Sequence, residues 1–104
     1  MSEARIEALG GNRYRVAGVL DAFTTPKLLE ESAAHFSSQP SGDIHVDLGG
    51  VTESDSAGLA LLLEWLRVGR QRNQRLHFGN VPKQLAALAR ISEVEELIQP
   101  SDAA

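Results

Sequence analysis

The chain has 104 residues, of which 42% are hydrophobic and 23% charged, with a formal net charge of -4, so we expect one folded domain with a single core. Lysine and arginine are scattered apart from a mildly basic run at residues 67–75, which argues against nucleic-acid binding, and the absence of cysteine excludes disulfides and thiol nucleophiles. The most apolar window, residues 57–66, is too short to cross a bilayer and residues 1–7 lack the apolar run of a secretory signal, so we expect a cytoplasmic protein without membrane insertion.

The N-terminal part of the chain predicts a hairpin followed by a helix. Residues 4–9 alternate between small apolar and charged side chains, and residues 14–20 resume the alternation after two glycines and an asparagine, which tolerate positive φ. This pattern is typical of two antiparallel strands. Thr24 or Thr25 then suits the N-cap of a helix, Pro26 suits its first turn, and its apolar face extends to Phe36.

The middle of the chain predicts a crossover between parallel strands. Residues 43–48 alternate and form the third strand, which Gly49 and the glycine after it are expected to end. A long helix follows to about residue 71, and residues 76–78 form a short fourth strand. Because a strand, a helix and a strand follow one another here, the third and fourth strands are expected to be parallel.

Two further helices are predicted near the C-terminal end. Asn80 suits the cap of the first, and residues 92–95 have the spacing of a capping box for a short last helix. The predicted fold is therefore an α/β domain over residues 1–99, with a mixed four-stranded sheet covered by about four helices, and residues 100–104 are expected to form a loose tail.

The segment of residues 53–59 between the third strand and the long helix is the most informative for function. Asp55 or Ser56 suits the N-cap of the helix, and a structural cap is one interpretation. The other is that Ser56 and the first-turn amides, which Gly58 leaves uncovered, bind a polar or acidic group of a partner protein.

The long helix carries two apolar stripes. One contains Leu59, Leu62, Leu63 and Leu66 and is expected to face the core. The second contains Ala57, Leu61, Trp65 and Val68. Either neighbouring helices cover this second stripe, or it is an exposed docking face with Trp65 as its anchor.

The sequence offers little support for catalysis or metal binding. Ser56 has no histidine nearby in the sequence, because His35 falls on a predicted helix and His45 and His77 fall on predicted strands. His45 and His77 are expected to approach each other without an obvious third ligand. We therefore expect a protein that is not an enzyme and that has no cofactor or metal.

Three segments carry a family resemblance. Residues 17–26 (AGVLDAFTTP), 46–51 (VDLGGV) and 54–59 (SDSAGL) resemble the STAS domain family of anti-sigma-factor antagonists and transporter-associated domains. Within this family, residues 58–63 (GLALLL) are most similar to the small STAS subunit of the Mla phospholipid-transport ABC complex of Gram-negative bacteria.

The resemblance implies a role for each residue of the turn. It places Ser56 at the hydroxyl position where the Mla subunit contacts its ATPase, with Asp55 and Gly58 beside it. Sigma-factor antagonists of the family carry a second hydroxyl residue, the phosphate acceptor, at the position that is Ala57 here. Because alanine cannot be phosphorylated, this difference favours the transporter subunit, although Ser56 remains an alternative phosphorylation site.

The sequence therefore supports a leading hypothesis and one alternative. The leading hypothesis is a non-enzymatic accessory subunit that binds the cytoplasmic ATPase of a phospholipid-transport ABC complex. It would reach the inner membrane through that partner and help maintain outer-membrane lipid asymmetry. The sequence leaves open whether the isolated chain self-associates. The alternative is an anti-sigma-factor antagonist in a kinase-controlled partner switch. The predicted partner-binding residues are Asp55, Ser56, Ala57, Gly58, Leu61, Trp65 and Val68.

Overall fold

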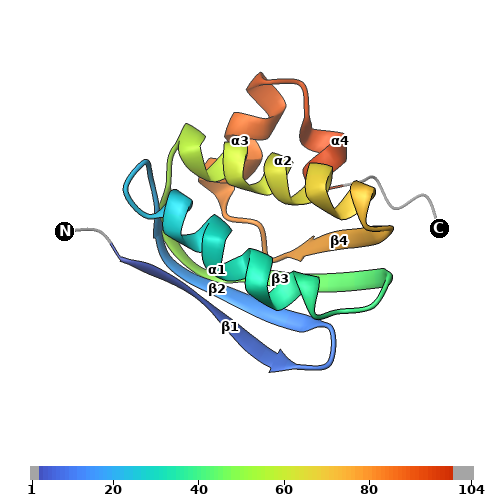
Figure 1. Cartoon of the computed structure of the whole chain (residues 1–104). Helices are drawn as coiled ribbons and strands as arrows, with labels where there is room; N and C mark the ends of the chain where they lie inside the picture. The colour runs from blue at the N-terminus through green and yellow to red at the C-terminus, as the bar shows by residue number, and fades with distance from the viewer. Residues whose placement is uncertain (1–2, 100–104) are drawn as a thin grey trace.

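The computed structural model describes residues 3–99, which form a four-stranded sheet and four helices (Figure 1). In chain order the elements are β1 (Ala4–Gly10), β2 (Arg13–Leu20), α1 (Thr25–Ser37), β3 (Gly42–Ser54), α2 (Ser56–Gln71), β4 (Gln74–Gly79), α3 (Lys83–Ile91) and α4 (Glu95–Ile98). This order confirms the predicted α/β fold. The tail expected at residues 100–104 lies outside the described residues.

The sheet is mixed, with the strand order β1-β2-β3-β4. Strands β1 and β2 pair antiparallel, whereas β2 with β3 and β3 with β4 are parallel. The hairpin turn contains Gly10 and Gly11 at φ angles of 105° and 58°, a backbone region that favours glycine. Both the predicted hairpin and the predicted parallel crossover are confirmed.

Strand β3 is longer than the sequence predicts. The two glycines were expected to end it after residue 48, but it continues to Ser54. A Cβ atom on Gly50 would lie only 2.8 Å from the Cβ of Ala17, so glycine here lets β2 and β3 approach closely where their register shifts. The extra residues carry the strand to the point where α2 begins.

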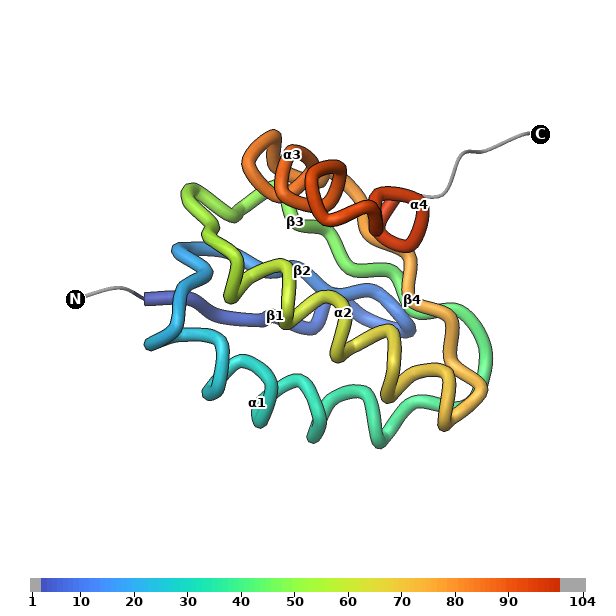
Figure 2. Tube along the Cα trace, turned by 90° about the horizontal axis from the view of Figure 1, so that it is seen from above, coloured from blue at the N-terminus to red at the C-terminus, as the bar shows by residue number. Residues whose placement is uncertain are grey.

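All four helices lie on one face of the sheet (Figure 1). Seen from above, α2 runs between α1 on one side and α3 with α4 on the other (Figure 2). The inward-facing side chains of β3, Ile44, Val46 and Leu48, are at most 1% exposed, and Leu62 of α2 is fully buried above the sheet. The opposite face of the sheet carries polar side chains, so the core lies between the sheet and the helices.

Two residues of the predicted docking face are inside this core. Leu61 and Trp65 are 4% and 3% exposed, and Val68 is partly buried. The prediction of an exposed face is wrong because α1 lies along this side of α2. The ring of Phe36 on α1 packs edge-on against the ring of Trp65, with 5.8 Å between centroids. The alternative interpretation, that a neighbouring helix covers the stripe, is confirmed.

The part of the apolar surface of α2 that the rest of the protein does not fully cover lies on another side of the helix. Leu59 and Leu62 of the predicted core stripe are buried, but Leu63 and Leu66 are only partly buried. The helix is therefore apolar on more than one side, as the sequence indicates. Each of the two stripes has two buried and two partly buried residues, so neither is a fully exposed face.

The caps of the last two helices also differ from prediction. Helix α3 has Pro82 at its N-cap position, and Asn80 instead adopts a φ of 51° and donates from Nδ2 to Oδ1 of Asp47 at 3.0 Å. Helix α4 has Val94 at its N-cap position, and Ser92 caps the C-terminus of α3.

Within residues 3–99, no helix has the length and hydropathy needed to span a membrane.

Candidate functional site

Two strand-to-helix turns lie side by side at one end of the strands of the sheet. Strands β2 and β3 are parallel neighbours whose last residues, Leu20 and Ser54, are paired in register. Strand β2 leads into α1 and β3 leads into α2, so both turns lie at the carboxyl ends of their strands (Figure 1). In parallel sheets the carboxyl ends of the strands commonly carry the binding site. The N–H of Asp55 donates to the carbonyl of Leu20 at 3.1 Å, which joins the two turns directly.

The turn between β3 and α2 is held by Asp55. Its backbone is extended, with φ -114° and ψ -164°, and its Oδ1 accepts a hydrogen bond from the N–H of Ala57 at 2.8 Å. The carbonyl of Asp55 accepts from the N–H of Gly58 at 3.0 Å. Asp55 is therefore the N-cap of α2, as the sequence allows, and its carboxylate lies at the positive end of the helix.

The two residues after the cap differ in accessibility. Ser56 is exposed at the start of α2, whereas Ala57 is partly buried. No hydrogen bond from the Ser56 hydroxyl to another side chain is found within residues 3–99. A hydroxyl held on a capped helix turn can contact a partner, and a side chain at position 57 would be less accessible.

Gly58 is required by the packing beneath the turn. It is buried, and a Cβ atom at this position would overlap Oγ of Ser54 and lie 3.0 Å from Cβ of Leu20. The backbone N–H of Ser54 is held from α3 by Oε1 of Gln84 at 2.9 Å. Gly58 therefore allows α2 to begin close against β2.

The turn between β2 and α1 presents an aromatic ring. Oδ1 of Asp21 accepts hydrogen bonds from the N–H groups of Phe23 and Thr24 at 2.9 and 3.0 Å, and the Thr24 hydroxyl donates to the carbonyl of Val19 at 2.7 Å. These bonds fix the loop backbone, and the Phe23 side chain is 88% exposed. An aromatic residue this exposed, on a fixed loop at the same end of the sheet as the first turn of α2, has the properties of a binding anchor.

Sequence reasoning missed Phe23 as a functional residue. It falls inside the segment that carries the family resemblance, between Asp21 and two threonines, and just before Pro26. The signal available was an aromatic residue between Asp21 and Pro26, two residue types that favour turns. Leu61 and Trp65, which the sequence assigned to partner binding, are buried under α1 and are not part of this exposed edge.

The histidines lie away from both turns. His35 is on α1 beside Tyr14, with ring centroids 5.4 Å apart, and His45 and His77 stack on the open face of the sheet at 4.9 Å. The predicted approach of His45 and His77 is confirmed. Within the described residues 3–99, no group of three or more histidine, aspartate or glutamate side chains is arranged to hold a metal ion, and none of the histidines is brought to Ser56.

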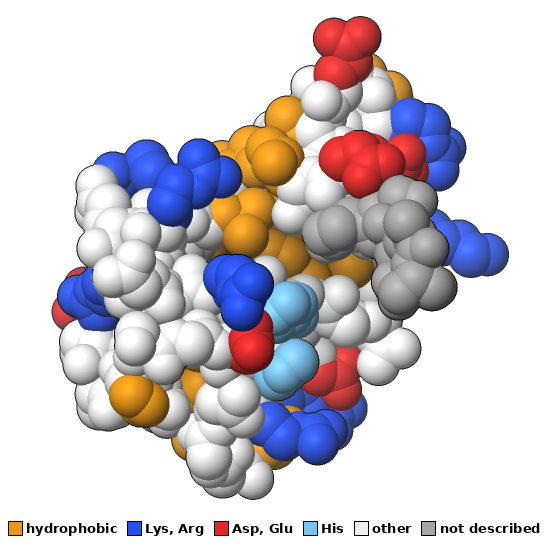
Figure 3. All heavy atoms as spheres, turned by 90° about the vertical axis from the view of Figure 1, so that its right-hand side faces the viewer, with side chains coloured by type: hydrophobic (Ala, Val, Ile, Leu, Met, Phe, Trp, Pro, Cys, Tyr) orange, Lys and Arg blue, Asp and Glu red, His pale blue; other side chains and the backbone are white. Residues whose placement is uncertain are grey.

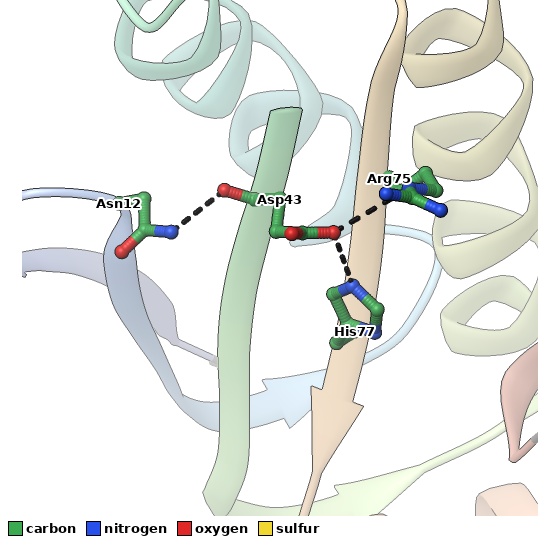
Figure 4. Close-up of polar contacts among 4 residues, drawn as sticks. All are labelled: Asn12, Asp43, Arg75 and His77. Atoms are coloured by element: carbon green, nitrogen blue, oxygen red, sulfur yellow. Dashed lines mark hydrogen bonds and ion pairs between the residues drawn. The ribbon is translucent and has the colours of Figure 1, made fainter. Parts of the chain in front are cut away.

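Asp43 organises the polar face beside these histidines (Figure 4). Its Oδ1 lies 2.8 Å from Nε2 of His77 and 3.5 Å from Nε of Arg75, and its backbone carbonyl accepts from Asn12 at 2.8 Å. The hydrogen bond to His77, together with the charge of Arg75, lowers the pKa of Asp43 below its ordinary value. The arrangement is a surface polar cluster that links β3 and β4.

Comparisons with known proteins agree on the family. The family model described as "Mlab, STAS domain" matches residues 10–99. The anti-sigma-B factor antagonist of Staphylococcus epidermidis is 30% identical over 88 residues, which cover 85% of this chain and 81% of that protein. The anti-sigma-B factor antagonist of Staphylococcus aureus strain NCTC 8325 matches with the same identity and coverage.

A solved structure supports the fold. The unphosphorylated form of the anti-sigma factor antagonist SpoIIAA superposes with a TM-score of 0.72 over 91% of this chain and 84% of that one, at 14% sequence identity. At this identity the likeness shows the fold alone. Because the family model spans most of the sequence and relatives of 30% identity cover most of its length, this chain belongs to the STAS domain family.

Proposed function

We propose that the protein is a non-enzymatic regulatory domain that binds a partner protein through the first turn of α2 and the adjoining loop between β2 and α1. The observation that carries the proposal is that two exposed residues lie on adjoining turns at the same end of the sheet: Ser56 on a capped turn, and Phe23, 88% exposed, on a loop held by Asp21. A polar contact beside an aromatic anchor is a common arrangement at the centre of a protein interface. In this proposal Asp55 and Gly58 position the turn rather than supply binding energy.

The residue after Ser56 sets how such binding is controlled. Ala57 stands where sigma-factor antagonists of the family accept phosphate, and an alanine there cannot be modified. Binding at this turn is therefore proposed to be independent of phosphate at position 57. A phosphate on Ser56 would place about two negative charges at the centre of the proposed contact and would weaken binding to any partner surface that is not basic.

The named relatives favour an anti-sigma factor as the partner. The curated staphylococcal proteins that match this chain at 30% identity are anti-sigma-B factor antagonists. By this candidate function, the protein sequesters an anti-sigma factor and thereby releases a sigma factor. Control by a kinase would then require Ser56 as the phosphate acceptor, because Ala57 lacks a hydroxyl.

The residues of the turn favour a second candidate partner, the ATPase of a phospholipid-transport ABC complex. The matching family model is described as "Mlab, STAS domain", and the sequence from Gly58 to Leu63 resembles the small STAS subunit of such a complex. By this candidate function the protein stays in the cytoplasm, reaches the inner membrane through the ATPase, and stabilises the ATPase conformation that it binds more tightly.

Affinity capture with matched variants tests the proposal and separates the two partners. The tagged chain, expressed in its native host, is compared with the variants Phe23→Ser and Ser56→Glu and with the control Ser41→Glu. The control adds the same charge as Ser56→Glu at an exposed position just before β3, at the opposite end of the strands. An anti-sigma factor or an ABC ATPase is expected with the wild type and the control. Its recovery is expected to fall at least about tenfold with Phe23→Ser and Ser56→Glu.

Retention of that partner by both turn variants would contradict the proposal. Intact-mass measurement after incubation with ATP and the captured partner adds an independent result. A mass gain of one phosphate that is lost in Ser56→Ala would support the anti-sigma-factor candidate, whereas co-purification of a membrane permease with the ATPase would support the transport candidate.

A further inference from the structure

A groove of about 500 Å³ lies between α2, β4 and α4, away from the two turns. Its floor is apolar and consists of Leu63, Leu66, Leu76 and Leu97, of which Leu97 is 48% exposed. Figure 3 shows this hydrophobic hollow with basic side chains beside it, and the residues that line the groove identify them as arginines. The partly buried leucines of α2 that the core leaves uncovered therefore belong to a concave surface.

The border of the groove is basic, although the whole chain carries a net charge of -4. Arg67, Arg70 and Arg75 line it, together with one acidic residue, Glu96. Arg67 is paired with Glu64 at 2.6 Å and Arg75 lies 3.5 Å from Asp43. For Arg70, no acidic side chain within residues 3–99 lies at ion-pair distance. A ligand carboxylate would therefore complement the charge at the Arg70 end of the groove.

The groove follows β4, whose outer side pairs with no other strand among residues 3–99. Strand β4 is the last strand of the sheet, and the N–H of Gly42 donates to the carbonyl of Asn73 at 2.9 Å. In a parallel ladder this register directs the backbone groups of residues 75 and 77 towards β3 and those of Leu76 and Phe78 towards the outer edge. Such an edge can pair with an added strand.

We propose that this groove binds an extended segment of a partner protein, with alternating apolar and acidic residues, as a fifth strand along β4. Alternate side chains of an added strand point to opposite faces of the sheet. The apolar ones would lie on the leucine floor, and the acidic ones would lie on the polar face near Arg75 and His77. Beyond the paired residues, where this alternation no longer holds, an acidic residue beside the start of β4 would lie on the groove side and pair with Arg70.

Peptide selection tests this occupant directly. Random dodecapeptides displayed on phage are selected on the full chain, and an enriched peptide is synthesised with a fluorescein label. The expected sequences alternate apolar and acidic residues. Binding followed by fluorescence anisotropy is expected to weaken at least about tenfold in Arg70→Glu and in Leu97→Ser. Arg72→Glu is the matched control, since Arg72 is an exposed arginine at the same end of α2 that does not line the groove.

Amide hydrogen exchange reports the mode of binding. The added strand is expected to slow exchange at the amides of Leu76 and Phe78, which point to the open edge. Any one of three results would overturn the proposal. These are enriched peptides that lack acidic residues, equal binding of the peptide to Arg70→Glu and Arg72→Glu, and unchanged amide exchange at Leu76 and Phe78. Ser56→Glu is expected to leave peptide binding unchanged, so this test is independent of partner binding at the turn. Circular dichroism confirms that each variant is folded.

Discussion

The indole N–H of Trp65 on α2 donates a hydrogen bond of 2.6 Å to the hydroxyl of Ser32 on α1. Both residues are buried, at 3% and 0% exposed, and the Ser32 hydroxyl in turn donates to the carbonyl of Leu29 at 2.9 Å. The pair joins the two helices beside the packed rings of Phe36 and Trp65. It explains why Trp65 is part of the core and not a surface anchor.

Replacing Ser32 is predicted to destabilise the fold. Ser32→Ala leaves the buried indole N–H of Trp65 without an acceptor, which costs about 1–3 kcal/mol of the free energy of unfolding. Urea denaturation followed by circular dichroism measures this loss. Because Trp65→Phe removes the donor, the double variant is expected to lose less than the sum of the two single losses. Strict additivity would show that the hydrogen bond contributes nothing.

Gly58→Ala is predicted to destabilise the protein by about 1–3 kcal/mol, since the new methyl group would overlap Ser54 Oγ and press on Leu20. Thermal unfolding measures the effect. The same substitution combined with Ser54→Ala removes the closest atom and is expected to restore part of the stability. Gly79→Ala is the control, because a Cβ atom there meets nothing within 4 Å. Equal melting temperatures for Gly58→Ala and Gly79→Ala would refute the packing argument.

Loss of the α2 cap is predicted to cost about 1 kcal/mol. Asp55→Ala removes the acceptor for the N–H of Ala57, whereas Asp55→Asn keeps an oxygen at the same place and is expected to be close to wild type. Ser56→Ala is expected to leave the stability unchanged, because Ser56 is exposed. Chemical denaturation of the three variants distinguishes the cap from its neighbour, and a loss in Ser56→Ala equal to that in Asp55→Ala would contradict the assignment.

The titration of Asp47 is predicted to depend on Asn80. The hydrogen bond from Asn80 and then that from the N–H of Gly49 lower the pKa of Asp47 below its ordinary value of 3.8. Asn80→Gly suits the positive φ at this position and removes the larger contribution. Nuclear magnetic resonance titration of the Asp47 carboxyl carbon is expected to show the pKa rising in the variant.

The same substitution changes the acid stability. Because the pKa of folded Asp47 is lowered, its contribution is present above the ordinary pKa and is lost as the pH falls through the lowered value. The stability lost between pH 5 and pH 2 is therefore expected to be smaller in Asn80→Gly than in the wild type. Urea midpoints measured across this range provide the comparison, and an unchanged pH dependence would count against the role of Asn80.

The fold was largely predictable because its signals are local. Alternation identified the first three strands, the turn residues placed the hairpin, and the order of elements gave the parallel crossover. The length of β3 was not predictable, because the close approach of Gly50 to Ala17 depends on pairing between strands far apart in sequence. By local preference a glycine pair would end a strand. Here the close packing of β2 against β3 lets the strand continue through the pair.

The site was predictable only in part. The cap at Asp55 follows from residue preference at the start of a helix, and the structure confirms it. The exposure of α2 could not be inferred, because the sequence does not show on which side of α2 helix α1 packs. Trp65 is consequently in the core, whereas Leu63 and Leu66 are only partly buried. Phe23 was missed since exposure of a loop side chain has no periodic signal.

The hydrogen bonds that Asp21 and Thr24 make within their loop have a consequence for binding kinetics. They keep the ring of Phe23 outside the domain whether or not anything covers it. A protein that meets this edge thus encounters an aromatic group already in place, and little chain entropy is lost on association. Complex formation there is expected to be limited by diffusional encounter, with lifetime and not association rate setting the affinity.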